Sequence, residues 1–350
     1  MPDALATALE NFDYYTGAEK YMSGRIEYVP WEFLVHVINN KTPLSERSWA
    51  MREYLLKRPM FGKCYFDVPY DDVMLETNSQ VCKLNGQPYA LDAIRSFGGV
   101  CAMQADFAAR VGQAIGVPAL YVEGTGANGS LHAWVMWVEI RNATKNSLQF
   151  TLESAGRYRI DNYYVGDFRD PQTGQRTTDR ATELRLQTVG LNYVAKRQTD
   201  LVMRFFPKLV ELEQLTPTKQ LIFLRDVINL CPGNENAWQS VATMVRDGKL
   251  DKSDTKTLNA VVERLFATFR NVPDFTLGVF DNMFSYRDAG KPRNAIYERL
   301  TDLDKQGKRR SLPSAAGLKL TDILMTQEQS TAAVEGLAAT IKRLPGEGNY

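Results

Sequence analysis

Histidine and cysteine are both scarce in this chain of 350 residues. Any histidine-dependent chemistry must use His36 or His132, since there is no third histidine. Four cysteines are too few for a disulfide scaffold of this size, and no two of them form a CxxC pair. A structural zinc site would need scattered ligands, so we expect neither a metal nor a cofactor. The cysteines are Cys64, Cys82, Cys101 and Cys231.

The chain also lacks a strong charge and a long apolar run. Its 42 Lys and Arg residues balance 41 Asp and Glu residues, which favours neither nucleic acid nor a membrane surface as the main partner. The longest apolar segment, LHAWVMWVEI, has about half of the roughly 20 residues that a membrane helix needs. The N-terminal MPDALATALENFDYY does not resemble a signal peptide. We expect no membrane segment, while the compartment stays open between the cytoplasm and export after signal removal.

The length and the patterning predict two domains. Residues 1–200 mix helical and strand-like stretches, whereas from about residue 200 helical stretches follow one another without a strand signal. The segment PGNENAWQSVATMVRDGKL resembles a fragment of a tetratricopeptide repeat, but the spacing to later helices is irregular. We therefore predict an α-helical, tetratricopeptide-like hairpin array over 201–350, which could bind a protein partner on a concave face.

The most informative stretch is FGGVCAMQADFAARVGQAIGVPALYVEG, which begins at residue 97. A glycine pair comes before a helical pattern, and Gly116 with Pro118 ends it. Then come a strand (ALYVE), a loop (GTGANGS), a longer strand (LHAWVMWVEI), a turn (NATKNS) and a further strand (LQFTLE). The loop fits GxGxxG, yet a strand follows it instead of a helix, so we do not expect a dinucleotide site. The predicted buried face of the helix is formed by Met103, Phe107, Val111 and Ile115.

This pattern places Cys101 at the start of a helix and His132 on a strand. Unpaired N–H groups and the positive end of the helix dipole favour a thiolate at Cys101, and the imidazole of His132 could act as its base. The alternative is that Cys101 is a small buried residue and His132 a hydrogen-bonded strand residue. For His36, in the helical segment PWEFLVHVINN, we expect a packed or surface position without a catalytic role.

Three ordered motifs resemble the core of the transglutaminase-like superfamily across about residues 95–155. They are Gly99-Val100-Cys101, Gly116-Val117-Pro118-Ala119 and His132-Ala133-Trp134. The resemblance implies an α+β, papain-like catalytic domain within residues 1–200, with Cys101 as nucleophile and His132 as base.

The family completes its triad with an acidic residue, usually Asp, on the strand after the histidine. The resemblance places Glu153 in this role, although a simple hairpin register would set His132 opposite a residue slightly beyond it. Asp161 is the second candidate, and the alternative for Glu153 is a solvated strand residue. For the oxyanion we expect the Cys101 N–H, with a side-chain donor from Gln87 or Asn85.

The resemblance also implies a reaction class. It predicts acyl transfer through a cysteine thioester on an amide or peptide bond, in a protein or peptide substrate. We expect hydrolysis, as by a protease or amidase. The alternatives are transglutaminase cross-linking and a catalytically silent module that binds proteins or peptides.

Overall fold

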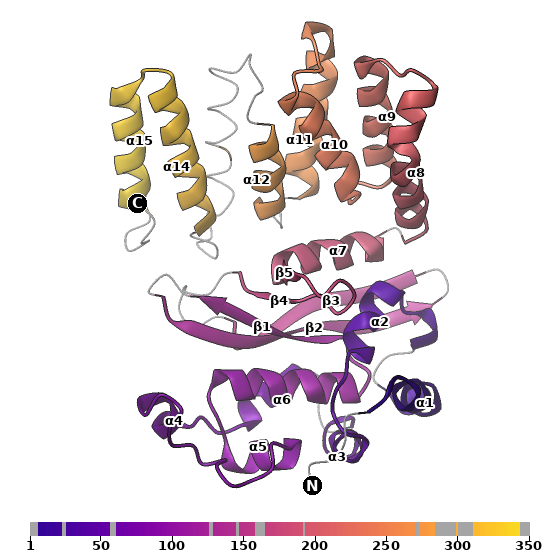
Figure 1. The fold of residues 1–350 in the computed structure, drawn as a ribbon, viewed down its shortest axis with the longest axis vertical. Coiled ribbons are helices and arrows are strands. Elements are labelled where there is room, and N and C mark those ends of the chain that lie inside the picture. Colours follow the sequence, from indigo (N-terminus) through magenta and orange to yellow (C-terminus); the bar gives the residue numbers. More distant parts are fainter. Residues whose placement is uncertain are drawn as a thin grey trace. The chain divides into compact units, whose positions relative to one another are not determined.

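A computed structural model describes residues 6–22, 26–56, 61–125, 129–144, 147–157, 165–191, 193–269, 273–283, 299 and 311–343 (Figure 1). The chain forms two compact units, residues 1–186 and 187–350. The sequence predicted the division later, at residue 200. Residue 200 lies inside helix α8 (Tyr193–Leu212). The helical region begins before it, at α7 (Asp179–Leu191).

Helices come first in the first unit. The predicted helical segment after Pro30 is present, and α2 and α3 each follow a proline (Pro30 and Pro43) that fixes the entry of the chain. The long helix α6 starts at Cys101, as expected. The helices of this unit are α1 (Ala8–Ala18), α2 (Trp31–Ile38), α3 (Leu44–Tyr54), α4 (Asp72–Glu76), α5 (Leu91–Phe97) and α6 (Cys101–Ala114), with short 3-10 turns at Glu19–Tyr21, Ile26–Tyr28 and Phe61–Asp67.

One antiparallel sheet of five strands follows, in the order β3-β2-β1-β4-β5. The strands β1 (Ala119–Thr125), β2 (Leu131–Thr144) and β3 (Ser147–Ala155) are those that the sequence predicts. The strands β4 (Asp167–Arg169) and β5 (Arg176–Thr178) have three residues each, too few for an alternating pattern to reveal them. The unit is therefore α+β.

Both faces of β2 are buried, which explains its continuous apolar run. Ala133, Val135 and Trp137 face the core cluster that contains the buried side of α6. Trp134 and Met136 pack on the other face with residues of β1. The predicted inner face of α6 is confirmed, because Phe107, Val111 and Ile115 are buried and Met103 packs against the same cluster.

The glycine pair ahead of α6 brings two segments close together. The Gly99 N–H donates to the Pro69 carbonyl at 2.9 Å, and the Asp71 N–H donates to the Gly99 carbonyl at 3.1 Å. Gly98 has φ +89°, and a Cβ at this position would lie 2.4 Å from the Pro69 oxygen. Only glycine fits there, so the pair fixes the point at which α6 begins.

The described part of the second unit is helical throughout and contains no strand. Thr216 and Asn234 cap α9 and α10 with their side chains, and Pro217 stands at the first position of α9. Leu221, Leu224 and Trp238 belong to the fully buried core of this unit. Its further helices are α9 (Pro217–Leu230), α10 (Glu235–Arg246), α11 (Thr255–Thr268), α12 (Pro273–Asn282), α14 (Ser311–Thr326) and α15 (Ser330–Arg343).

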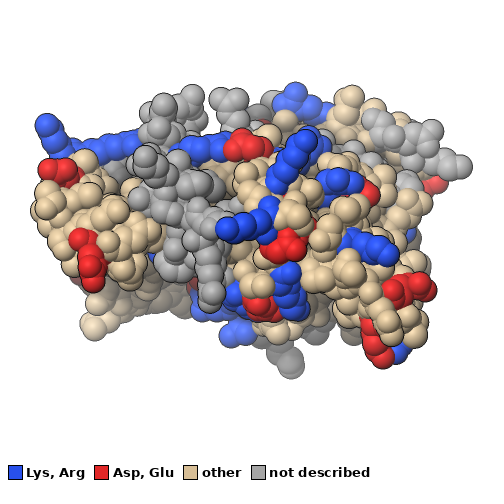
Figure 2. Space-filling model, turned by 90° about the horizontal axis from the view of Figure 1, so that it is seen from above, with Lys and Arg blue, Asp and Glu red and all other residues tan. Residues whose placement is uncertain are grey.

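The face seen in Figure 2 carries charged side chains of both signs. On the face in Figure 2, basic and acidic side chains are interspersed, in keeping with the net charge of +1. Within the described ranges, no helix is both long and apolar enough to cross a membrane.

Candidate active site

Cys101 occupies the first position of α6. The preceding residue, Val100, is extended and provides no side-chain cap, so the first N–H groups of the helix lack a capping acceptor from it. The thiol is half-buried. A helix N-terminus without a cap stabilises a negative charge, and here the side chain that can carry this charge is the thiol itself.

The Cys101 sulfur lies beside Ala133, near the start of β2, where β3 no longer pairs with this strand. The last residue of β3, Ala155, pairs with Val135, so β3 does not reach Ala133. The Ala133 N–H instead forms a hydrogen bond with Cys101 Sγ. The Ala133 carbonyl accepts from the Tyr65 hydroxyl at 3.1 Å. The end of β3 thus leaves backbone groups of β2 available to hold the sulfur in place.

His132 lies next to Ala133 on β2, and its side chain forms a hydrogen bond with the Cys101 thiol. Burial is the largest single influence on this thiol and raises its pKa. The hydrogen bond with His132, the bonds with the Ala133 and Ala102 N–H groups and the charge of His132 act in the opposite direction, and the pKa of Cys101 lies below its usual value. The thiolate is the nucleophilic form, so the structure favours a reactive sulfur at this position.

A backbone carbonyl orients the imidazole. His132 Nε2 lies 2.5 Å from the Gly156 oxygen. A carbonyl oxygen can only accept, so Nε2 carries the proton in this contact. The other ring nitrogen, Nδ1, is then the one that can exchange a proton with the thiol. The centroid of the His132 ring lies 6.0 Å from that of the Trp134 ring.

Gly156 is held in place by its close surroundings. Its φ is +82°, and a Cβ would lie 2.4 Å from the Tyr65 ring. The next residue, Arg157, is almost fully buried and forms ion pairs with Asp179 at 2.5 Å and Glu183 at 2.7 Å, both on α7. These ion pairs fix the chain just after Gly156 and therefore the direction of the carbonyl that contacts His132.

Asp179 also ties this network to the segment before β4, since its Oδ1 accepts from the Gly166 N–H at 3.2 Å. Burial raises the pKa of Asp179 to about 6, although the Arg157 guanidinium acts in the opposite direction. The carboxylate is thus buried at a high cost in solvation, which its ion pair offsets in part.

Of the three predicted catalytic residues, the structure brings Cys101 and His132 together but does not bring Glu153 to the imidazole. Glu153 pairs with Trp137, five residues along β2 from His132, a separation of roughly 16 Å at the usual rise of a strand. A bulge at Ile140/Asn142 shifts the register by a single residue, too little to close that separation. Asp161 lies outside the described residues.

Among the described residues, the Gly156 carbonyl contacts His132 Nε2. The sequence could not indicate this acceptor, because every residue has a backbone carbonyl whatever its side chain. The predicted oxyanion donors Asn85 and Gln87 are both exposed, and no contact within the described ranges links either of them to Cys101.

The remaining cysteines and the second histidine have other environments. Cys64 and Cys231 are buried, and Cys82 accepts from the Leu84 N–H at 3.4 Å. No disulfide joins any of the four cysteines, all of which are described. His36 is packed inside the unit, edge-on to Phe168 with ring centroids 6.0 Å apart. Burial first, and then the charge of Arg185, lowers the pKa of His36 to about 4, so it is neutral at pH 7.

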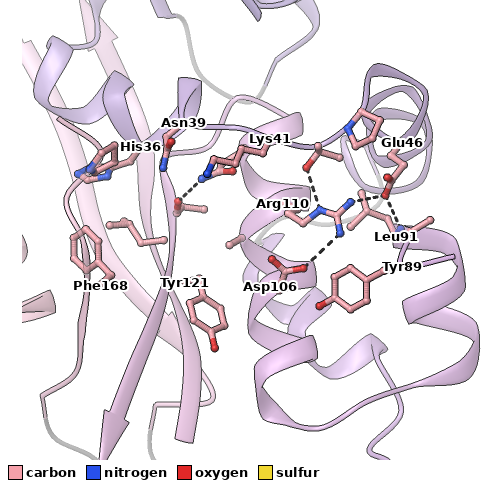
Figure 3. A pocket seen from close by; sticks show the side chains of 18 of the residues that line it. His36, Asn39, Lys41, Glu46, Tyr89, Leu91, Asp106, Arg110, Tyr121 and Phe168 are labelled. Carbon is pink, nitrogen blue, oxygen red and sulfur yellow. Dashed lines mark hydrogen bonds and ion pairs between the residues drawn. The ribbon is translucent and has the colours of Figure 1, made fainter. Parts of the chain in front are cut away.

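A pocket of about 1100 Å³ lies beside α6 and β1 (Figure 3). Its lining includes His36, Tyr89, Asp106, Arg110 and Tyr121, but neither Cys101 nor His132. The charge of Cys101 is among the causes that raise the pKa of the Tyr121 hydroxyl, after burial and the charge of Glu123.

No protein family, curated protein or solved structure matches the chain. Within the described ranges, no three His, Cys, Asp or Glu residues gather in a way that could hold a metal ion.

Proposed function

We propose that this chain is a transglutaminase-like cysteine enzyme that hydrolyses amide or peptide bonds through a thioester on Cys101. The observation that carries the proposal is the contact between the Cys101 thiol and the His132 imidazole, whose Nε2 is held by the Gly156 carbonyl. Nucleophile, base and orienting acceptor are the three parts that covalent acyl transfer requires.

The reaction begins with proton transfer from the thiol to His132 Nδ1. The sulfur then attacks the carbonyl carbon of the substrate, and the N–H groups at the start of α6 stabilise the oxyanion. The C–N bond breaks as the imidazolium gives its proton to the leaving amine, which leaves a thioester on Cys101. Water, deprotonated by His132, then attacks this thioester and releases the acid and the free thiol.

The neutral carbonyl acceptor has a chemical consequence. It fixes the tautomer and the orientation of the ring, as a carboxylate would, but it stabilises the imidazolium less because it carries no full charge. The helix N-terminus and the Ala133 N–H add to the effect of His132 in stabilising the thiolate.

An activated ester tests the proposal without knowledge of the natural substrate. We expect p-nitrophenyl acetate to release nitrophenolate in a burst and to add one acetyl group to the Cys101 peptide, as measured by mass spectrometry. Cys101→Ala should lose the adduct, whereas Cys82→Ala should keep it. His132→Gln should slow both formation and loss of the adduct, because the base is removed while the polarity of the side chain is kept.

The same assay separates the alternatives. Loss of the acetyl group to water supports a hydrolase, and its transfer to an added primary amine in preference to water supports a transglutaminase. A wild-type protein that acquires no acetyl group at Cys101 would contradict the proposal and favour a binding module.

A further inference from the structure

Tyr65 lies between the two backbone segments that contact the thiol and the imidazole. It is 3% exposed and belongs to the buried cluster against which Cys101 packs. Its hydroxyl donates to the Ala133 carbonyl at 3.1 Å. Its ring lies against Gly156, where a Cβ would come within 2.4 Å of it. One buried side chain therefore contacts both of these backbone segments.

Ala133 directs its N–H and its carbonyl away from β1 and toward the line of β3. In an antiparallel sheet both groups of one residue face the same neighbouring strand, and this direction alternates along the chain. The Val138 N–H donates to the Pro118 carbonyl at 2.9 Å, on the side of β1. Ala133 is an odd number of residues away from Val138 along β2, so its two groups face the other side.

The Tyr65 hydroxyl occupies a position that β3 leaves open. The register of β2 with β3 would set Arg157 opposite Ala133, but β3 has ended and the chain turns at Gly156, whose φ is +82°. The Ala133 N–H contacts the Cys101 sulfur there, and the carbonyl of the same residue accepts from the hydroxyl. The hydroxyl and the sulfur thus take the place of the next residue of β3.

The 3-10 segment Phe61–Asp67, which carries this tyrosine, is fixed on both sides. The ring of its first residue lies edge-on to the Trp137 ring of β2, with centroids 5.2 Å apart. Just after its end, the Val68 carbonyl accepts from the Gln104 side chain at 2.9 Å. Gln104 is buried on α6, in the first turn after Cys101. The tyrosine is therefore held relative to both the strand of the histidine and the helix of the cysteine.

We propose that Tyr65 is a positioning residue of the candidate site, which holds the nucleophile and its base in one arrangement. Its hydroxyl fixes Ala133 and thereby the N–H that contacts the Cys101 sulfur. Its ring fixes Gly156 and thereby the carbonyl that orients His132. The inference rests on the proposed function, because this positioning serves a thiol and an imidazole that react together.

Loss of the hydroxyl has a specific consequence for the sulfur. Ala133 is 3% exposed, so bulk water does not readily replace the hydroxyl as a donor to its carbonyl. A buried carbonyl without a donor is unfavourable, and the backbone moves to find another one. This movement takes the Ala133 N–H away from the sulfur, so the thiolate loses one of the groups that stabilise it.

Tyr65→Phe removes the hydroxyl and keeps the ring. We expect the inflection in the pH dependence of Cys101 alkylation, measured by peptide mapping with iodoacetamide, to move upward toward that of an ordinary thiol. Tyr54→Phe is the matched control, because Tyr54 belongs to the same buried cluster and its hydroxyl donates at 3.0 Å to Asp67, at the end of the same segment. This control should leave the inflection at its wild-type position.

The role of the ring is tested through the imidazole by nitrogen NMR. His132 Nε2 carries the proton in the contact with Gly156, so the wild type and Tyr65→Phe should both show this tautomer. Tyr65→Leu lacks the ring and should populate the other tautomer as well. His36 is the only other histidine, and its unchanged signals show that the unit is folded. Retention of the wild-type tautomer in Tyr65→Leu would contradict the role of the ring.

The alkylation profiles keep the two proposals distinguishable. If the wild-type inflection is low and Tyr65→Phe does not move it, the reactive thiol stands and the positioning role is wrong. An equal shift in Tyr54→Phe would also overturn the inference, because the effect would then be a general loosening of the segment. If the wild-type inflection is already that of an ordinary thiol, the proposed function itself fails.

Discussion

Cys101 in the first unit and Cys231 in the second occupy opposite ends of a helix. Cys101 begins α6, whereas Cys231 follows the last residue of α9 and donates its N–H to the Val227 carbonyl. The pKa of Cys101 lies below its usual value, and that of Cys231 is raised, chiefly by burial. Thr199 and a backbone N–H bond to Cys231, but no imidazole is present there. The same side chain is thus favoured as a thiolate in one unit and as a thiol in the other.

The units also differ in where they place their charges. Arg157 of the first unit is 3% exposed and forms ion pairs with two buried carboxylates. In the second unit, pairs such as Lys208 with Glu211 are mostly exposed to solvent. Burying a charge is unfavourable for the free energy of folding, and buried ion pairs fix geometry. The contrast indicates that the first unit is less stable than it could be because its buried ion pairs hold the candidate site in place.

The largest expected effect comes from breaking the buried ion pairs. Arg157→Met leaves Asp179 buried without its ion-pair partner, while Glu183 keeps its ion pair with Arg180 at 2.5 Å, so the free energy of unfolding of the first unit should fall by about 3–5 kcal/mol on account of Asp179. Lys208→Met in the second unit should cost less than about 1 kcal/mol. Hydrogen exchange resolved by peptide can measure both units in one protein. Equal losses for the two variants would contradict the contrast.

The buried histidine predicts a pH dependence that is specific to the first unit. The folded state holds the pKa of His36 at about 4, below its usual value of about 6.5, so only the unfolded state binds a proton between these pH values. The free energy of unfolding should therefore fall by about 3 kcal/mol between pH 6.5 and pH 4 on account of His36.

His36→Phe should remove the part of this pH dependence that comes from His36, whatever the substitution does to the free energy of unfolding at pH 7. Asp179 acts the opposite way: its folded pKa of about 6 is above its usual value, so stability from this group falls as pH rises from about 4 to about 6. The comparison is therefore between the pH slopes of wild type and variant in chemical denaturation. Parallel slopes would contradict the assignment of His36 as a buried neutral histidine.

The two cysteines should differ in reactivity. Iodoacetamide at pH 6 reacts with thiolates, so Cys101 should be alkylated faster than Cys231 in the folded protein. Peptide mapping after partial labelling measures both sites in one sample, and the protein unfolded in urea serves as control, since the two rates should converge there. Comparable rates in the folded protein would remove the distinction between the two helix ends.

The sequence predicted the parts of the site that depend on residue type and local pattern. The four-residue spacing after Cys101 fixed the helix, and the alternation around His132 fixed the strand, so the nucleophile and the base followed. The contact between the Gly156 carbonyl and His132 depends on strand register and on where β3 ends, which no local pattern encodes. The domain division was misplaced for a similar reason, because α7 and α8 continue through the position where the composition changes.

The smallest expected effect concerns Glu153. The triad from the sequence predicts that Glu153→Gln lowers activity, whereas the register of β3 predicts a change of less than about twofold in acylation of Cys101. The burst amplitude and rate with p-nitrophenyl acetate provide the measurement. A loss close to that of His132→Gln would show that Glu153 reaches the imidazole in the working enzyme.

The pH dependence of alkylation at Cys101 tests the central claim, that His132 and the start of α6 hold this sulfur as a thiolate. The rate should rise with an inflection below the usual thiol pKa of about 8.5 in the wild type, and the inflection should move upward in His132→Gln. A wild-type inflection at or above the usual value, or one that His132→Gln leaves unmoved, would contradict the account.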